Sequence, residues 1–380
     1  MSEALLIVAA SETDANLYYA TKFWAPDPFI FTQINGRKIL VLSDLELDRA
    51  KAEAKVDEVL SLSKLQGQAK RSTAAPTGLN RPAGLNGVLD LLLKERQVTS
   101  LKVPSNFPIG LADRLREKGY TLKVARDPFF PERMIKTKEE VAAIRETQRL
   151  TEEAVKSALA VIQQAQIKDG ELWLRGQPLT SELIRKFLQV ALIGSDCLGR
   201  ETIVASGLQA CDPHCIGSGP LKADEPIVLD VFPVSLKSRY FADMTRTVVR
   251  GKASEKVKKM YRAVQEGQEI AFGKLKAGVD GKEVHEAILK YFEQEGFPTG
   301  LIDGRMQGFF HGTGHGVGLE IHEPPRVSTV SQILQAGQVV TVEPGLYYRD
   351  AGGVRLEDMV LITETGCENL TAFPKLLELG

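Results

Sequence analysis

The sequence predicts two domains: an α/β domain over residues 1–130 and an α+β domain over residues 131–380. Three observations support this division. The 380 residues exceed the usual size of one domain. Strand-like and helix-like segments alternate in the first part, which is typical of an α/β fold. The second part opens with a long helical pattern and is then rich in short apolar segments of the strand type.

Short apolar runs and turn residues define the elements of the first domain. Strands are expected at residues 5–10, 37–43, 100–104 and 121–127, and helices at residues 87–97 and 109–120. Residues 66–87 are rich in Gly, Pro, Ala and polar side chains. This composition predicts a long surface loop.

A long helix over residues 138–163 is predicted to open the second domain, directly after the proline-containing boundary segment 127–137. Thr137 and Glu140 have the spacing of a capping box. The apolar residues that follow keep a period of about 3.6 residues, as in a helix with one buried face. Two further helices are expected, at residues 254–276 and 281–294.

The remainder of the second domain is predicted to be rich in β-strands. Candidate strands span residues 201–207, 226–234, 239–249, 308–318, 338–348 and 354–363. Several of them are apolar except for one or two carboxylates or histidines. An isolated charge is expensive to bury in an apolar strand, so these exceptions indicate a binding partner, often a metal ion.

Charge and composition exclude some classes of partner. The chain has 48 Lys and Arg against 49 Asp and Glu, whereas binders of nucleic acid or anionic membranes need a basic excess. The first apolar run, residues 4–10, is too short to span a membrane and lacks the basic flank of a signal peptide. The four cysteines do not make a disulfide scaffold. We therefore expect a cytoplasmic protein with reduced thiols and no membrane or nucleic-acid partner.

Five of the exceptional side chains lie in or beside apolar β-segments: Asp230, Asp243, His315, Glu343 and Glu357. Taken singly, each is more simply explained by a turn cap or an ion pair. Four acids that converge without a metal would repel one another strongly. Two divalent cations would neutralise them and would leave a position for a bridging water or hydroxide.

The ligand types narrow the choice of metal. Carboxylates with one imidazole favour Mn²⁺, Co²⁺, Zn²⁺ or Fe²⁺ over ions that prefer thiolates. We expect two divalent ions, with Mn²⁺ first and Co²⁺ or Zn²⁺ as alternatives. A separate zinc site at Cys211, His214 and Cys215 would lack the second Cys/His pair that such a site needs.

Five motifs make the chain resemble the Xaa-Pro peptidases, prolidase and aminopeptidase P, of the methionine aminopeptidase/creatinase superfamily, peptidase family M24. They occur in order as PHCIGSG (213–219), LDVFP…YFADMTRT (229–247), HGTGHGVGLEIHEPPR (311–326), TVEPGLYY (341–348) and VRLED (354–358). The N-terminal part also resembles the non-catalytic α/β domain of this family. The resemblance implies a pita-bread fold for residues 131–380, in which two αββ-type halves enclose the catalytic site.

The resemblance also assigns a role to each candidate ligand. It implies that Asp230 chelates one metal ion and that Asp243 and Glu357 bridge two. His315 and Glu343 would complete the site of the second ion. Glu343, an acid at the edge of the metals, is the candidate to accept a proton from the attacking water.

Three histidines match residues that line the substrate site of the family. His214 and His322 match those that assist at the scissile amide, and they are expected to donate hydrogen bonds to the developing oxyanion. His311 matches a third histidine near the substrate pocket. His285, in the 281–294 helix, lies off the apolar stripe and is expected at the surface.

Three more side chains are candidates for substrate binding. Arg326 either clamps a substrate carboxylate, as a dipeptidase would need, or pairs with a surface acid. Arg355 is expected to orient a ligand carboxylate. Tyr347 either does the same or only packs.

The spacing of the first two acids departs from the family pattern. Asp230 and Asp243 are 13 residues apart, two more than expected, and Phe232 stands where a glycine is expected. Because side chains along a strand alternate with a period of two, two extra residues in the hairpin keep both acids on one face.

The resemblance implies a dinuclear-metal exopeptidase that hydrolyses the bond before proline, as an Xaa-Pro aminopeptidase or dipeptidase. Its substrates would be peptides with proline at the second position, and we expect a homodimer. Two alternatives stay open. One is an exopeptidase of the methionine aminopeptidase type, whose chain is usually shorter. The other is an inactive protein of the same fold that only binds its partner.

Overall fold

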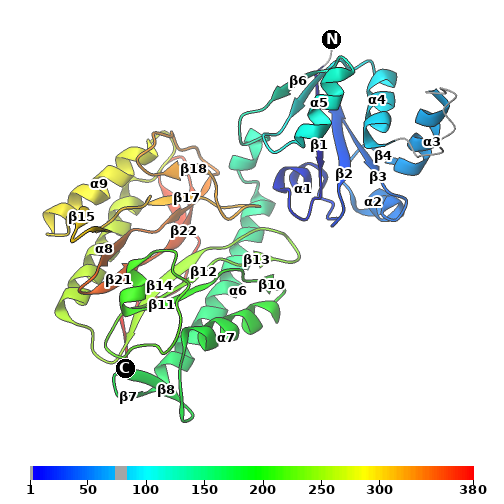
Figure 1. Cartoon of the computed structure of the whole chain (residues 1–380). Coiled ribbons are helices and arrows are strands. Elements are labelled where there is room, and N and C mark those ends of the chain that lie inside the picture. Colours follow the sequence, from blue (N-terminus) through cyan, green and yellow to red (C-terminus); the bar gives the residue numbers. More distant parts are fainter. Residues whose placement is uncertain (1–2, 73–83) are drawn as a thin grey trace. The chain divides into compact units, whose positions relative to one another are not determined.

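The computed structural model describes residues 3–72 and 84–380. The chain divides into two compact units, Met1–Arg133 and Met134–Gly380, whose elements are labelled in Figure 1. Within the described part, none of the helices has the length and apolar character needed to cross a membrane.

The first unit is built on one six-stranded mixed sheet. Its strands, in spatial order, are β4 (Glu58–Ser61), β3 (Arg37–Leu42), β2 (Phe29–Ile34), β1 (Glu3–Ala9), β5 (Ser100–Val103) and β6 (Thr121–Val124). Strand β2 runs antiparallel to both of its neighbours, β3 and β1. The outer strands β4, β5 and β6 each run parallel to the neighbour they join.

Helices cover both faces of this sheet. One face carries α1 (Ala15–Thr21) and α2 (Leu47–Glu53), and the other carries α3 (Leu62–Ser72), α4 (Leu85–Glu95) and α5 (Ile109–Glu117). Alternation along the strands supplies both cores: Leu6 packs with residues of α4, while its neighbour Ile7 packs with Leu17 of α1. The predicted α/β alternation is therefore confirmed, although α1, β2, α2 and β4 are not among the predicted elements.

The prediction of a surface loop over residues 66–87 is wrong at both ends. Helix α3 continues to Ser72, and α4 begins at Leu85. The helix persists in a polar segment because Leu65 and Ala69, four residues apart, are both buried. Residues 73–83 lie outside the described part of the chain.

The second unit contains two halves, each a sheet backed by a pair of helices. The first half has a four-stranded sheet and two helices: β11 (Ile203–Ser206), β12 (Ile227–Val231), β14 (Met244–Arg250), β24 (Glu378–Leu379), α6 (Lys138–Gln163) and α7 (Ser181–Ile193). Its core joins Ile162 of α6 and Leu188 of α7 to Leu229 and Met244 of the sheet.

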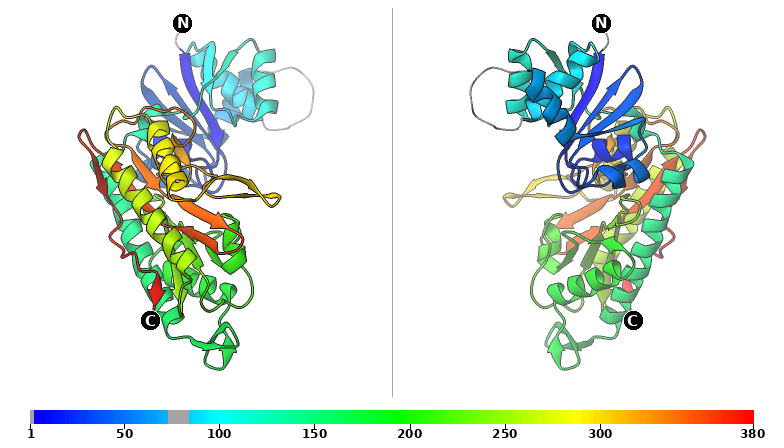
Figure 2. Two further views of the ribbon diagram at one scale, coloured as in Figure 1. Left: turned by 90° about the vertical axis from the view of Figure 1, so that its left-hand side faces the viewer. Right: turned by 90° about the vertical axis from the view of Figure 1, so that its right-hand side faces the viewer.

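The second half repeats this plan. It has a five-stranded sheet and two helices: β18 (Glu323–Val327), β17 (Gly314–Gly316), β19 (Val339–Val342), β22 (Asp358–Ile362), β23 (Cys367–Asn369), α8 (Glu255–Lys274) and α9 (Gly281–Gln294). Figure 2 shows α8 and α9 side by side. Their residues Val264 and Ile288 pack in one core with Val340 and Val360 of the sheet.

Short elements complete the chain. They are β7 (Gln166–Lys168), β8 (Glu171–Leu174), β9 (Gln177–Pro178), β10 (Cys197–Leu198), β13 (Val234–Ser235), β15 (Gly300–Ile302), β16 (Arg305–Gln307), β20 (Gly345–Tyr348), β21 (Gly352–Arg355), and the 3₁₀ turns η1 (Pro131–Met134) and η2 (Gly207–Cys211). Residues 345–348 lie within the predicted strand 338–348, and residues 234–235 and 352–355 overlap the predicted strands 226–234 and 354–363; the other short elements are not among the predicted ones. The strand predicted over 308–318 is reduced to β17, because this glycine-rich segment is irregular and its pairing shifts register at His315.

The predicted capping box at the start of α6 is confirmed. The Thr137 hydroxyl accepts a hydrogen bond from the Glu140 amide (3.2 Å), and the Glu140 carboxylate accepts one from the Thr137 amide (3.0 Å). The other oxygen of Glu140 accepts a hydrogen bond from the buried Tyr240 hydroxyl. The start of α6 is therefore tied to the segment that leads into β14.

Thr137→Ala should lower the free energy of unfolding by about 1 kcal/mol, because it leaves an amide of the first turn without its acceptor. Ser157→Ala is the matched control, since Ser157 is exposed in the interior of the same helix and its hydroxyl donates to the Glu153 carbonyl oxygen. Chemical denaturation followed by circular dichroism compares the two variants. Equal losses in both would contradict a specific capping role.

Candidate metal centre

Two of the candidate ligands lie on neighbouring strands of the first half. Strands β12 and β14 are antiparallel, with Asp230 directly opposite Thr245. Asp243 precedes β14 and is two residues from Thr245, so it shares the face of Asp230. The longer hairpin between the acids therefore leaves both on one face, as the parity argument predicts.

The other three candidates come from adjacent strands of the second half. The antiparallel ladder between β19 and β22 ends with Val342 opposite Asp358. Glu343 directly follows β19 and Glu357 directly precedes β22, so both lie next to this last pair. His315 lies on β17, which pairs with β19 through Gly316 and Val340.

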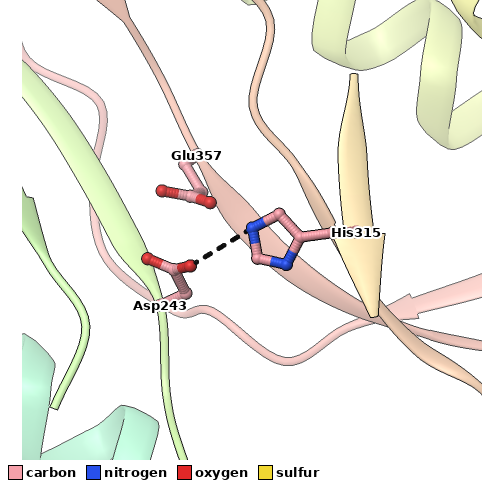
Figure 3. Close-up of side chains that lie close together, drawn as sticks. All are labelled: Asp243, His315 and Glu357. Atoms are coloured by element: carbon pink, nitrogen blue, oxygen red, sulfur yellow. Dashed lines mark ion pairs between the residues drawn. The ribbon is translucent and has the colours of Figure 1, made fainter. Parts of the chain in front are cut away.

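These side chains from the two halves converge in the interior, as Figure 3 shows for Asp243, His315 and Glu357. The His315 Nε2 atom lies 3.6 Å from Asp243 Oδ2 and 3.4 Å from Glu343 Oε1. One potential ligand atom from each of Asp243, His315 and Glu357 lies within 4.8 Å of the other two. All three side chains are buried.

The residues present fit a divalent cation. Asp230 Oδ1 and Asp243 Oδ1 are both buried and accept no hydrogen bond, which is costly for a carboxylate unless a cation faces it. Carboxylate oxygens and one imidazole nitrogen form a donor set that suits such ions. In residues 3–72 and 84–380, one group of His, Cys, Asp and Glu side chains is close enough to share an ion: Asp243, His315 and Glu357. The cysteine-containing alternative at residues 211–215 does not form such a group.

The electrostatics of the site show the same lack of compensating positive charge. Burial and the neighbouring carboxylates, Glu357 first, raise the pKa of Asp243 well above its usual range. Burial and the charge of Glu343 do the same to the pKa of Glu357. Burial raises the pKa of Glu343 to about 7, although the charge of Arg355 opposes this rise. Without a cation, the site therefore retains protons that ordinary carboxylates would lose.

The imidazole of His315 is in the state that a metal ligand needs. Burial, and then the nearby His322, lower the pKa of His315 to about 3. The ring is therefore neutral at physiological pH, with a nitrogen lone pair available. Its Nδ1 atom lies 3.1 Å from the Gly316 carbonyl oxygen, so this nitrogen carries the proton and Nε2 faces the carboxylates.

Arg355 connects the ligands to a network of polar side chains. Its Nη2 atom donates to Asp230 Oδ2 (2.7 Å), so it holds a candidate ligand carboxylate. Its Nη1 atom donates to the hydroxyl of the buried Tyr347 (2.9 Å), and its Nε atom donates to Thr245 Oγ1 (3.2 Å). Sequence reasoning does not identify Thr245; its position two residues after Asp243 in a strand is the signal that it shares the ligand face.

His311 lies beside Tyr347 with both ring nitrogens engaged. Its Nδ1 atom is 2.8 Å from the Gly312 carbonyl oxygen, which can only accept, so Nδ1 donates. Its Nε2 atom accepts a hydrogen bond from the Tyr347 hydroxyl at 2.9 Å. Burial and then the charge of Arg355 lower the pKa of His311 to about 3. The structure therefore places His311 as the end of a chain that starts at Arg355.

Three exposed candidates surround this buried centre. The His322 ring meets the His315 ring edge-on, with centroids 4.4 Å apart, and partial desolvation lowers the pKa of His322. Arg326 is the strand partner of His315 across the β17–β18 ladder. His214 follows Pro213, whose carbonyl oxygen lies 3.5 Å from Arg355 Nη2. All three thus belong to segments that contact the centre.

The prediction that His285 lies at the surface is wrong. Its side chain is 2% exposed, its Nδ1 atom lies 3.0 Å from Thr313 Oγ1, and its ring packs against Phe309. The apolar face of α9 is wide enough to include this position beside Val284 and Ile288. Thr313 provides the polar partner that makes the burial of an imidazole tolerable.

Comparison with known proteins identifies the family. Residues 142–364 match metallopeptidase family M24. The chain is 32% identical over 278 residues to a protein of Pyrococcus horikoshii named Xaa-Pro dipeptidase, covering 72% of this chain and 73% of the relative.

Solved structures extend the likeness to almost the whole chain. The X-Pro aminopeptidase of Thermotoga maritima has a TM-score of 0.81 at 25% identity, covering 99% of this chain and 97% of the other. The prolidase of Pyrococcus horikoshii has a TM-score of 0.78 at 27% identity, covering 99% and 95%. These likenesses confirm the expected α/β N-terminal part and the pita-bread fold that follows it. The chain belongs to metallopeptidase family M24, and it is a peptidase that depends on divalent metal ions.

Proposed function

We propose that the protein is an exopeptidase that hydrolyses the peptide bond before a proline at the second position of its substrate. The observation that carries this proposal is the convergence of the buried Asp243, His315 and Glu357 with the partly exposed Glu343. It occurs in a chain whose relatives are named Xaa-Pro dipeptidase and X-Pro aminopeptidase.

Charge supports two divalent ions at the centre. Asp230, Asp243, Glu343 and Glu357 together carry four negative charges when ionised, and two divalent ions balance them. Asp230 would bind one ion, Asp243 and Glu357 would bind both, and His315 and Glu343 would complete the second. Carboxylate-rich donors favour Mn²⁺ first, with Co²⁺ and Zn²⁺ as alternatives.

Divalent ions held by these residues supply Lewis-acid chemistry, which polarises the scissile carbonyl group and makes water a stronger nucleophile at neutral pH. Glu343 is the general base that takes the proton from the attacking water. Its carboxylate lies 3.4 Å from His315 Nε2, at the edge of the donor set, which supports this role.

His322 and His214 assist the reaction from the exposed side of the centre. Each ring can donate a hydrogen bond to the carbonyl oxygen as negative charge develops on it. The position of the His322 ring against His315 supports this role. His311 acts differently: both of its ring nitrogens are engaged, so it serves substrate binding by holding Tyr347 and, through it, Arg355.

Proline and a free C-terminal carboxylate are the recognition features of the substrate. Proline has no amide N–H to donate to the enzyme. A site that needs no hydrogen bond from this position of the substrate can therefore accept the proline ring. Arg326 is exposed and adjoins the centre, and within the described residues its side chain forms no ion pair. This supports the clamp role, in which Arg326 binds the carboxylate of a dipeptide.

We also propose a cytoplasmic homodimer. The four cysteines are unpaired, which supports a reducing compartment. An apolar stripe on α7 supports self-association, because Leu183, Phe187 and Val190 share one exposed face of this helix. Sedimentation velocity measures the oligomeric state directly.

Metal-stripped protein, reloaded in parallel with Mn²⁺, Co²⁺ or Zn²⁺, should hydrolyse Ala-Pro or Ala-Pro-Ala and leave Ala-Ala intact. Asp243→Ala should lose both activity and metal binding, because it removes a buried ligand. Asp350→Ala, which removes a carboxylate that pairs with Lys256 at the surface, is the control and should retain both. Preferential turnover of Met-Ala would instead favour the methionine aminopeptidase type, and normal turnover by Asp243→Ala would refute the site.

Arg326→Ala should raise KM for Ala-Pro by about tenfold or more, because a hydrogen bond between charged groups contributes about 1.5–3 kcal/mol. The KM for Ala-Pro-Ala should change little, since its carboxylate lies one residue farther from the scissile bond. Steady-state kinetics on both peptides separate the two effects. An equal rise in both KM values would show that Arg326 does not read the dipeptide carboxylate.

The metal-free protein should lose stability as the pH rises from about 4 through about 7. In the unfolded chain the carboxyl groups ionise near pH 4, whereas the folded site retains a proton on Glu343 up to a pKa of about 7. A folded pKa above the unfolded one means that ionisation costs stability as the pH rises. Mn²⁺ should therefore raise the melting temperature more at about pH 7.5 than at about pH 5.5.

Differential scanning fluorimetry of chelator-treated protein, with and without Mn²⁺, measures this difference. Glu343→Gln is the control, because it cannot ionise and should show a smaller decline with pH. A stabilisation by Mn²⁺ that is the same at both pH values would contradict the electrostatic account.

A further inference from the structure

We propose that Thr245 is a positioning residue for the metal centre, whose hydroxyl orients the carboxylate of Glu357 and joins it to Arg355. This inference rests on the proposed use of Glu357 as a metal ligand. It assigns a role to a residue that is neither a ligand nor a substrate contact.

The hydrogen bonds of Thr245 have a fixed direction. The side chain is fully buried on β14. Its Oγ1 atom lies 3.2 Å from Arg355 Nε and 2.7 Å from Glu357 Oε2. An arginine N–H can only donate, so the hydroxyl oxygen accepts this bond and gives its single proton to Glu357. The carboxylate of Glu357 is thereby held in one rotation.

This bond connects ligands from the two halves of the unit. Arg355 also donates to Asp230 Oδ2 at 2.7 Å. One guanidinium group therefore holds Asp230 directly and Glu357 through the Thr245 hydroxyl. Partners that orient metal ligands in this way commonly contribute 10- to 100-fold to metal affinity.

The backbone of Glu357 has other supports, so loss of the hydroxyl should leave the fold in place. The Glu357 amide donates to the Thr245 carbonyl oxygen (3.0 Å). The Glu357 carbonyl oxygen accepts a hydrogen bond from Arg246 Nη1 (2.7 Å). Replacing Thr245 with isosteric valine should therefore free the Glu357 carboxylate to rotate, while the Glu357 backbone stays in place.

Thr247 provides a matched control on the same strand. It is also fully buried, and it shares the face of Thr245 because it lies two residues farther along. Its hydroxyl accepts from the Arg355 amide (2.9 Å) and donates to the Arg355 carbonyl oxygen (2.8 Å). Thr247→Val thus removes a buried hydroxyl from the same strand without touching a ligand carboxylate.

Isothermal titration of the metal-free full-length chain with Mn²⁺ tests the proposal. Thr245→Val should bind Mn²⁺ about 10- to 100-fold more weakly than the unaltered protein. Thr245→Ser, which restores the hydroxyl, should bind Mn²⁺ as the unaltered protein does, and so should Thr247→Val. Melting temperatures of the metal-free proteins give the separate cost in stability, which both valine variants should show.

Unchanged Mn²⁺ affinity in Thr245→Val would overturn the proposal, and so would an equal loss in Thr247→Val. If Thr245→Val fails to fold, Thr245→Ala is compared with Thr245→Ser, and the same affinities decide. Failure of the unaltered protein to bind Mn²⁺ would refute the proposed metal centre together with this inference. Normal binding by both the unaltered protein and Thr245→Val would refute this inference alone.

Discussion

The catalytic unit is organised around four carboxylates that repel one another, two of them buried and two only slightly exposed. Arg355 is the cation bonded directly to one of them, Asp230. Of the others, Asp243 comes from one half and Glu343 and Glu357 from the other, and burial together with neighbouring carboxylates raises the pKa of each. Such an arrangement persists only if rigid strands hold it, because relaxed side chains would separate or turn to water. The site is therefore a rigid group of negative charges that divalent ions can neutralise.

The two-halved architecture provides this rigidity. Asp230 and Asp243 belong to a sheet backed by α6 and α7, whereas His315, Glu343 and Glu357 belong to one backed by α8 and α9. Each half has its own close-packed core, so neither can shift its ligands without disturbing many buried side chains. The polar contacts between the halves, such as that of Thr245 with Glu357, are directional. Packing thus sets the distance between the halves, and hydrogen bonds set the orientation of the carboxylates.

Features of the structure that depend on residues close together in sequence could be predicted from the sequence. The capping box located the start of α6, and isolated charges in apolar strands indicated the candidate ligands, because both signals arise from residues close in sequence. Features that depend on distant partners were not accessible. The burial of His285 requires Thr313, and the role of Thr245 requires Glu357, 112 residues away. Helix α3 was not predicted because its sequence is mostly polar. What stabilises it is the packing of its buried face against a sheet, and that contact cannot be seen in the local sequence.

The buried Arg246 has a consequence for how the protein is made. Its guanidinium donates to the carbonyl oxygens of Glu357, Phe373 and Pro374, and β24 pairs with the far end of the same strand, β14. Residues 373–379 must therefore be synthesised before β14, the strand that follows Asp243, has all its neighbours. Until then the nascent chain holds its acids in an unfinished scaffold, so the centre reaches its final order only after most of the second unit has been translated.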